Sequence, residues 1–215
     1  MTRIDATRVI VELAGDAAIV ASLGHPAYDL FAAGDRPLNF YTWGSMGLAS
    51  SIGLGLALAR PELRVLVLDG DGSLLMNLGS LATIGLLRPA NLIVIVMDNE
   101  EYATTGGQPT PTAHGADLEG AARAMGISAA TTVRSEGELR RAVGWGRESI
   151  ADSASTGSTG RGTQNLQSTP DPNFIVVKVK ESAPTAKPPL DCVFIKQRFM
   201  SAIRSPQSAI AGAGL

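Results

Sequence analysis

The 215-residue sequence is poor in the residues that build several common functional sites. It contains one cysteine and two histidines, so a disulfide within the chain is excluded and a zinc site built from cysteine and histidine is disfavoured. The motifs HExxH and GxSxG are also absent. The sequence therefore argues against zinc-hydrolase and serine-hydrolase chemistry.

The sequence also has little net charge and no long apolar run. Lysine and arginine number 18 against 20 aspartates and glutamates, and the pI is near 5.7. Without a basic stripe interleaved with aromatic residues, nothing indicates nucleic-acid binding. No uncharged apolar run reaches the roughly 18 residues of a membrane span, and no signal peptide is recognisable. We expect a cytoplasmic protein that binds neither nucleic acid nor membrane.

Short apolar runs alternate along the chain with segments of helical periodicity. The apolar runs predict buried strands at 17–22, 64–70, 91–98 and 173–180. Helices are predicted at 6–14, 45–59, 73–85, 117–126 and 135–146. This alternation is typical of an α/β fold with a doubly wound, mostly parallel sheet between two layers of helices. The length suits one such domain over 1–215.

Residues 151–172 interrupt this pattern. Ser, Thr, Gly, Gln and Pro dominate the segment, and Leu166 is its only large aliphatic side chain. A segment of this length without secondary structure is either a functional flap or a tolerated insertion. Insertion into the domain is the simpler interpretation.

The stretch VLDGDGS (67–73) places an aspartate between two glycines where an apolar run ends. Position 75 is leucine, so the third glycine of a dinucleotide fingerprint is missing, and the chain has no GxxxxGK[ST] motif. The N-terminus of the following helix favours an anion such as phosphate, which Asp71 would repel unless a divalent cation lay between them. Asn99 follows the next strand and is the expected second ligand, because neighbouring parallel strands end at one edge. A turn and a helix N-cap remain the alternative interpretation.

Gly70, Asp71 and Gly72, followed by Asn99 28 positions after the aspartate, resemble the signature of thiamine diphosphate enzymes. The resemblance implies thiamine diphosphate and Mg²⁺ as cofactors. In that family the aspartate and asparagine side chains bind the metal with a backbone carbonyl two residues later, which here is the carbonyl of Glu101. The resemblance also implies that the cofactor site includes Gly70, Gly72, Ser73 and Tyr102, with Ser73 hydrogen-bonded to the diphosphate.

A second run, YTWGSMGLASSIGLGLA (41–57), is similar to a Trp-Gly-Ser-hydrophobic-Gly run of thiamine diphosphate decarboxylases. The similarity implies that the Gly44 carbonyl accepts a hydrogen bond from the aminopyrimidine group of the cofactor. It further implies that Ser45 lies in the cofactor site and that Met46 supports the bent, reactive form of the cofactor. The alternative for Met46 is a core methionine on the buried face of a helix.

Longer runs narrow the resemblance to one group of decarboxylases. The stretches GSMGLASSIGLGLALA, DGDGSLLMNLGSLATIG, DNEEYATTGGQPTPT and IKQRFM are similar to the family of sulfopyruvate decarboxylase β subunits and phosphonopyruvate decarboxylase. This resemblance covers nearly the whole chain apart from 151–172, and it implies decarboxylation of a small anionic 2-oxo acid. In this family the carboxylate that activates the pyrimidine ring comes from a separate domain. We therefore expect a pyrimidine-binding α subunit as partner in a hetero-oligomer.

His25 and His114 are the candidates for proton transfer. Both are expected in loops near the carboxyl edge of the sheet, and Gly24 and His25 follow the first strand, where the family contacts cofactor or substrate. Two other functions stay open. One is a 2-oxoacid ferredoxin oxidoreductase β chain, although such chains usually have cysteines for an iron–sulfur cluster. The other is a non-catalytic cofactor-binding module, against which the intact Asp71 and Asn99 argue.

Overall fold

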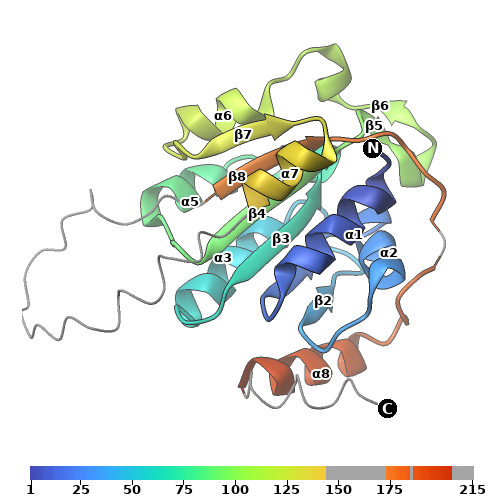
Figure 1. Ribbon diagram of the computed structural model, residues 1–215, viewed down its shortest axis with the longest axis vertical. Coiled ribbons are helices and arrows are strands. Elements are labelled where there is room, and N and C mark those ends of the chain that lie inside the picture. The colour runs from blue at the N-terminus through green and yellow to red at the C-terminus, as the bar shows by residue number, and fades with distance from the viewer. Residues whose placement is uncertain (144–172, 185, 205–215) are drawn as a thin grey trace, which may run out of the picture.

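Six parallel strands form the central sheet of the computed structural model, which describes residues 1–143, 173–184 and 186–204 (Figure 1). The strands lie in the order β2-β1-β3-β4-β8-β7. Their bounds are Ala18–Ala21 for β1, Asn39–Tyr41 for β2, Val65–Gly70 for β3, Leu92–Asp98 for β4, Ala130–Val133 for β7 and Asn173–Lys178 for β8. The predicted strands correspond to β1, β3, β4 and β8, whereas β2 and β7 are additional. The predicted insertion at 151–172 lies outside the described residues.

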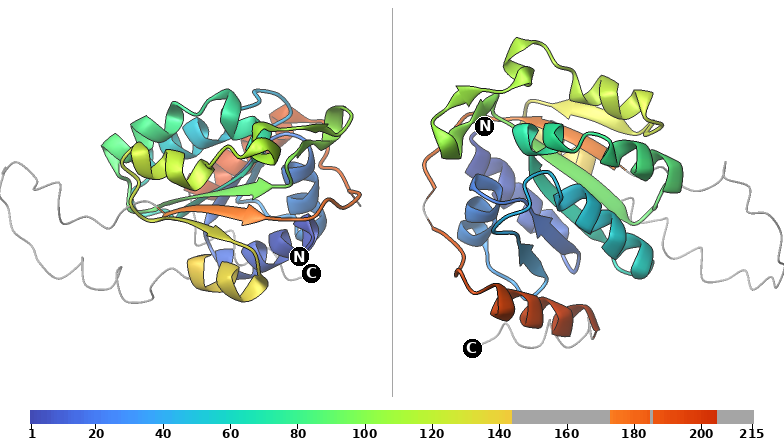
Figure 2. Two further views of the ribbon diagram at one scale, coloured as in Figure 1. Left: turned by 90° about the horizontal axis from the view of Figure 1, so that it is seen from above. Right: turned by 180° about the vertical axis from the view of Figure 1, so that it is seen from behind.

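Helices cover both faces of this sheet (Figure 2). One face carries α1 (Arg3–Ala14), α2 (His25–Ala33) and α7 (Glu136–Val143). The other carries α3 (Ala49–Ala59), α4 (Asp71–Met76), α5 (Ser80–Leu87) and α6 (Leu118–Ala124). Every residue of β4 is buried, as expected for a parallel strand covered on both sides. The doubly wound α/β fold is confirmed.

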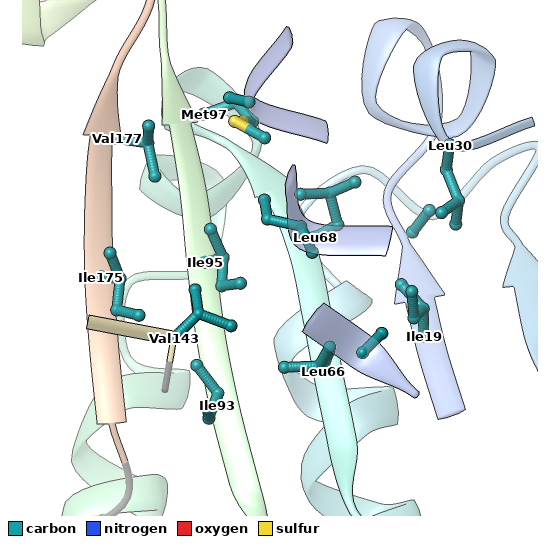
Figure 3. Packing of buried hydrophobic residues seen from close by; sticks show 14 of the residues in the cluster. Ile19, Leu30, Leu66, Leu68, Ile93, Ile95, Met97, Val143, Ile175 and Val177 are labelled. Carbon is teal, nitrogen blue, oxygen red and sulfur yellow. The ribbon is translucent and has the colours of Figure 1, made fainter. Parts of the chain in front are cut away.

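Alternation of side chains along the strands divides the core into two clusters. Ile19, Leu66, Ile93 and Ile95 point to the face of α1, α2 and α7, where they meet Leu30 and Val143 (Figure 3). The intervening residues, such as Val65, Val67, Val94 and Val96, pack against the helices of the opposite face. Successive residues of a strand point to opposite faces, so a continuous apolar run fills both clusters.

Helix α8 (Cys192–Arg204) lies beside β2, the strand at one edge of the sheet (Figure 1). Its Phe199 and Ile203 belong to a third, smaller cluster with Leu38 and Leu63. The rings of Phe40 and Phe199 lie 5.2 Å apart. No helix in the described part of the chain combines the length and the hydropathy that crossing a membrane requires.

Two predicted helices differ from the observed ones. The helix predicted at 45–59 begins only at Ala49, because the preceding residues form a turn in which Ser45 has a φ of 62°. The segment predicted as one helix at 73–85 is divided into α4 and α5. Asn77 ends α4 with a non-helical backbone, and its side chain donates a hydrogen bond to the Gly47 carbonyl at 3.0 Å.

The strand order creates a crevice at the carboxyl ends of β1 and β3. Strand β1 leads through α2 to β2 on one side, and β3 leads through α4 and α5 to β4 on the other. The two connections leave toward opposite faces of the sheet, and ligands of doubly wound folds bind at such a switch point. Strand β4 is followed by a small hairpin, β5 (Glu101–Tyr102) and β6 (Gln108–Pro109), with the 3₁₀ helices η1 (Ala103–Thr105) and η2 (Pro111–His114).

Candidate active site

A pocket at the carboxyl ends of β1, β3 and β4 brings most of the predicted site residues together. Its wall includes the predicted residues His25, Met46, Gly70, Asp71, Gly72, Ser73, Asn99, Glu101 and Tyr102. It also includes Arg3, Leu23, Pro26, Met97, Ala103 and Thr104, which the sequence motifs do not indicate. Gly24, Gly44, Ser45 and His114 are not in this wall.

Asp71 is the first residue of α4, and its side chain is almost wholly buried, at 2% exposed. The Thr110 hydroxyl donates a hydrogen bond to its Oδ2. The Thr112 hydroxyl lies 3.0 Å from the same oxygen and 2.9 Å from Oδ1 of Asp98. Burial raises the pKa of Asp71, and the nearby Asp98 carboxylate adds to the effect. Within the described residues no cation pairs with Asp71, whereas Asp98 pairs with Lys178 at 2.7 Å.

Asn99 and Glu101 follow β4 and face the same pocket as Asp71. The Asn99 amide nitrogen donates to Oε2 of Glu181 at 2.7 Å, and its Oδ1 accepts from the Glu101 backbone N–H at 3.4 Å. Glu100 lies between them in a sharp turn and has a left-handed backbone conformation, with a φ of 66°. The three predicted metal ligands thus lie in one wall. The described residues contain no group of three or more His, Cys, Asp or Glu suited to a metal, so any ion here needs other oxygens as well.

Ser73 links the loops around the pocket, and Gly72 lets the hairpin approach α4 closely. The Ser73 hydroxyl accepts from the Gly47 backbone N–H at 3.0 Å and bonds the Ser22 hydroxyl at 2.9 Å, which links the segments after β1, β2 and β3. At Gly72 an added Cβ would lie 2.3 Å from the Tyr102 ring. A residue without a side chain is therefore required where the hairpin approaches α4.

Replacing Gly72 with alanine should destabilise the protein by about 1–3 kcal/mol, because the new methyl group overlaps the Tyr102 ring. Urea unfolding of Gly72→Ala, Tyr102→Ala and the double variant measures the coupling, and the double variant should recover part of the loss. Gly79→Ala is the matched control, since an added Cβ there meets nothing within 4 Å. Additive losses at Gly72 and Tyr102 would contradict the steric explanation.

Met46 lies in the turn before α3, lines the pocket and is half-buried. It belongs to none of the three hydrophobic clusters formed by the described residues, which favours a role in the pocket over one in the core. Gly44 and Ser45 precede it in the same turn and are exposed. Their predicted contacts with the cofactor stay predictions.

The two histidines are not in the loops that the sequence predicts. His25 is the first residue of α2, where Gly24 with a φ of +77° and Pro26 set the helix start. The His25 side chain is 14% exposed, and burial lowers its pKa, as does the nearby Arg3. His114 ends η2 and is exposed away from the pocket wall. Of the two candidates for proton transfer, only His25 lines the pocket.

A buried ion-pair network behind the pocket has no sequence motif. Arg3 is 2% exposed, and its guanidinium pairs with Asp29 and Glu181 and donates to the Ser182 carbonyl at 2.7 Å. Burial raises the pKa of Asp29, although the hydrogen bond from Arg3 opposes this. The partners lie far apart in the chain, so no local pattern connects them. The bridge between Thr2 and Lys180 brings the two segments together.

The sequence and the fold of this chain are similar to those of known proteins. The chain matches the family described as thiamine pyrophosphate enzyme, C-terminal TPP binding domain, over residues 26–151. It is 51% identical to the sulfopyruvate decarboxylase subunit beta of Methanocaldococcus jannaschii over 60% of this chain and 69% of that protein. It is 37% identical to the same subunit of Methanococcus maripaludis over 95% of this chain and 98% of that protein.

Two longer proteins extend the comparison. The phosphonopyruvate decarboxylase of Streptomyces viridochromogenes is 44% identical over 66% of this chain and 36% of its own length. The thiamine diphosphate-dependent 4-hydroxybenzoylformate decarboxylase of Rhodococcus jostii RHA1 has the same fold, with a TM-score of 0.62 and 17% identity over 85% of this chain. This chain spans about a third of each longer protein. It belongs to the thiamine pyrophosphate enzymes and matches their C-terminal cofactor-binding domain.

Proposed function

We propose that this chain is the cofactor-binding β subunit of a thiamine diphosphate- and Mg²⁺-dependent decarboxylase that acts on sulfopyruvate or a similarly anionic 2-oxo acid. The main observation behind this proposal is that Asp71, Asn99 and Glu101 line the same pocket, at the ends of neighbouring strands. The substrate class follows the names of two relatives, whose alignments cover 60% and 95% of this chain.

The pocket residues fit a magnesium ion and a diphosphate. Asp71 offers a buried carboxylate with no cation partner among the described residues, and a divalent cation would stabilise its charged form. Asn99 Oδ1 and the Glu101 carbonyl add two neutral oxygens, and Mg²⁺ commonly takes its remaining ligands from substrate phosphates and water. Gly70, Gly72 and Ser73 form the wall beside Asp71, where we place the diphosphate.

The side chains of this subunit would orient the cofactor and move protons. When bound, thiamine diphosphate supplies the electron sink that allows a 2-oxo acid to lose CO₂. Met46 and Tyr102 would shape the cavity, and the Gly44 carbonyl would accept the aminopyrimidine hydrogen bond. His25 is the group that we assign to proton transfer, because its largely buried imidazole lines the pocket.

An α subunit carrying the pyrimidine-binding domain completes the proposed enzyme. The relatives from Methanocaldococcus and Methanococcus are named as subunit beta, which supports a two-chain assembly. The cytoplasmic location inferred from the sequence stays a prediction. So does the assignment of 1–215 to one domain with an insertion at 151–172.

The substrate is tested by measuring CO₂ release from the assembled two-chain complex with sulfopyruvate, phosphonopyruvate, pyruvate and 2-oxoglutarate. We expect sulfopyruvate to give the highest kcat/KM. A preference for phosphonopyruvate would instead support the second candidate, which the similarity to the Streptomyces enzyme favours. Reduction of an electron acceptor coupled to CO₂ release would indicate an oxidoreductase subunit. Cofactor binding without turnover of any 2-oxo acid would indicate a non-catalytic module.

Shortening Met46 to alanine should lower kcat by roughly 10- to 100-fold, because a cofactor without its support spends less time in the reactive geometry. Cofactor affinity and the melting temperature should change little, since Met46 lies outside the hydrophobic clusters of the described chain. Met46→Leu keeps most of the volume and is the matched control. Parallel losses of kcat, affinity and stability in Met46→Ala would instead support a core-packing role.

A further inference from the structure

One carboxylate behind the pocket contacts three residues of the pocket wall. Oε2 of Glu181 accepts a hydrogen bond from the Asn99 amide at 2.7 Å and pairs with the Arg3 guanidinium. Oε1 of Glu181 lies 3.2 Å from Nδ1 of His25. Arg3, His25 and Asn99 all line the pocket, whereas Glu181 itself does not.

The backbone fixes Glu181 in this place. The preceding residue, Lys180, donates its N–H to the Met1 carbonyl at 3.1 Å and accepts from the Arg3 N–H at 3.1 Å. The Val179 N–H donates to the Asp98 carbonyl at 3.0 Å, which extends the register of β8 beside β4. Glu181 is therefore attached to both neighbouring segments, and its side chain is only 34% exposed.

The negative charge of Glu181 gives each of these contacts a direction. An ionised carboxylate only accepts, so it selects the donor end of each partner. Toward Asn99 it selects the amide nitrogen, which turns Oδ1 toward the Glu101 N–H. Toward a neutral His25, whose Nδ1 lies 3.2 Å from Oε1, the negative charge favours the tautomer with the proton on Nδ1, which leaves Nε2 unprotonated.

We infer that Glu181 is a positioning residue that sets both the amide orientation of Asn99 and the tautomer of His25. The first part rests on the proposed function, in which Asn99 Oδ1 is a metal ligand. The second part concerns this chain alone and needs no cofactor. Residues that orient metal ligands typically change metal affinity by 10- to 100-fold when they are removed.

The tautomer of His25 provides the first test. In Glu181→Gln the amide oxygen should stay with the donors Arg3 and Asn99, which leaves the amide N–H₂ facing His25. His25 must then accept at Nδ1 and carry its proton on Nε2. ¹⁵N NMR of the full chain with labelled histidine, at about pH 8 where imidazole is neutral, distinguishes the two forms. The chain contains only two histidines, and a His114→Gln variant assigns their ring-nitrogen signals.

We expect the wild-type chain to show a protonated Nδ1 at His25 and the Glu181→Gln chain to show a protonated Nε2. The matched control is Glu12→Gln, which removes an exposed carboxylate paired with Arg140 at 2.8 Å on the far side of α1. This control should leave the His25 signals unchanged. The same tautomer in wild type and Glu181→Gln would overturn the inference for His25.

Mg²⁺-dependent thiamine diphosphate affinity of the two-chain complex tests the Asn99 part. Glu181→Ala should weaken it by roughly 10- to 100-fold, and Glu181→Gln, which can still accept from Asn99, by less than about threefold. Wild-type affinity in a folded Glu181→Ala complex would overturn this part. Equal weakening in both variants would also overturn it. If the wild-type complex binds neither Mg²⁺ nor the cofactor, the proposed function is wrong. The NMR comparison of the His25 tautomer in wild type and Glu181→Gln still tests the role of Glu181 in that case.

Discussion

Asp71→Asn should strongly weaken Mg²⁺-dependent cofactor binding while the protein stays folded. Truncating or neutralising one member of a buried charge pair costs about 2–5 kcal/mol, which corresponds to a roughly 30- to 3,000-fold loss of affinity. Asparagine keeps the shape of the side chain and an oxygen that can accept from Thr110 and Thr112. The substitution also removes an unpaired buried charge. We therefore expect an unchanged or slightly higher melting temperature.

Calorimetric titration of the two-chain complex with thiamine diphosphate, at several Mg²⁺ concentrations, measures this loss. The matched control is Asp16→Asn, because Asp16 precedes β1 at the opposite end of the sheet and pairs there with Arg64. Cofactor affinity in Asp71→Asn that equals wild type and still depends on Mg²⁺ would refute the metal assignment. A matching loss in Asp16→Asn would show that the effect is not specific to the pocket.

The purified chain should release no measurable CO₂ from sulfopyruvate until the α subunit is added. A missing general acid or base typically lowers a rate by about 10²- to 10⁴-fold, and we propose that the carboxylate that activates the pyrimidine ring lies on that partner. Leu48, Ile52 and Met76 expose much of their side chains on the α3 and α4 side, and Met76 borders the cavity next to Met46. Exposed apolar surface of this kind is expected where a partner completes a site.

A titration of the chain with increasing α subunit, followed by CO₂ release and by the mass of the complex, tests this dependence. Activity should saturate at the stoichiometry of the mixed oligomer. The Asp71→Asn chain with the same partner serves as the control for activity contributed by the partner preparation. Full turnover by this chain alone would contradict the two-chain proposal and would direct attention to Glu101, an exposed carboxylate in the pocket wall.

The sequence predicts the centre of the sheet because the central strands are continuous apolar runs. Strand β4 is buried along its whole length, and all of its residues except the terminal Asp98 are apolar. The additional strands lack this signal. β2 has three residues, and β7 is an edge strand with two half-buried threonines. Weakly periodic edge strands are fixed by tertiary contacts that a single sequence does not show.

Some residues of the site can be predicted from local sequence motifs, whereas others are placed by contacts between distant segments. Asp71 and Asn99 follow strands directly, so strand ends and motif spacing place both of them in one pocket wall. Gly24 and Pro26 flank His25 and suggest a loop, yet the same residues are compatible with a helix start. Arg3 and Glu181 meet only because β8 returns beside β4 and extends to Thr2. No spacing rule connects two residues at opposite ends of the chain.

The position of β8 between β4 and β7 has a consequence for synthesis on the ribosome. β4 has seven residues, all apolar except Asp98 and none of them proline, and its second edge stays open until residues 173–178 have been made. β7 is synthesised earlier, but in the described sheet it lies beside β8 and not beside β4, so it cannot close that edge. Open apolar strand edges are sites of aggregation in incomplete chains. Nascent chains that stall between β7 and β8 should therefore be the ones that depend most on chaperones.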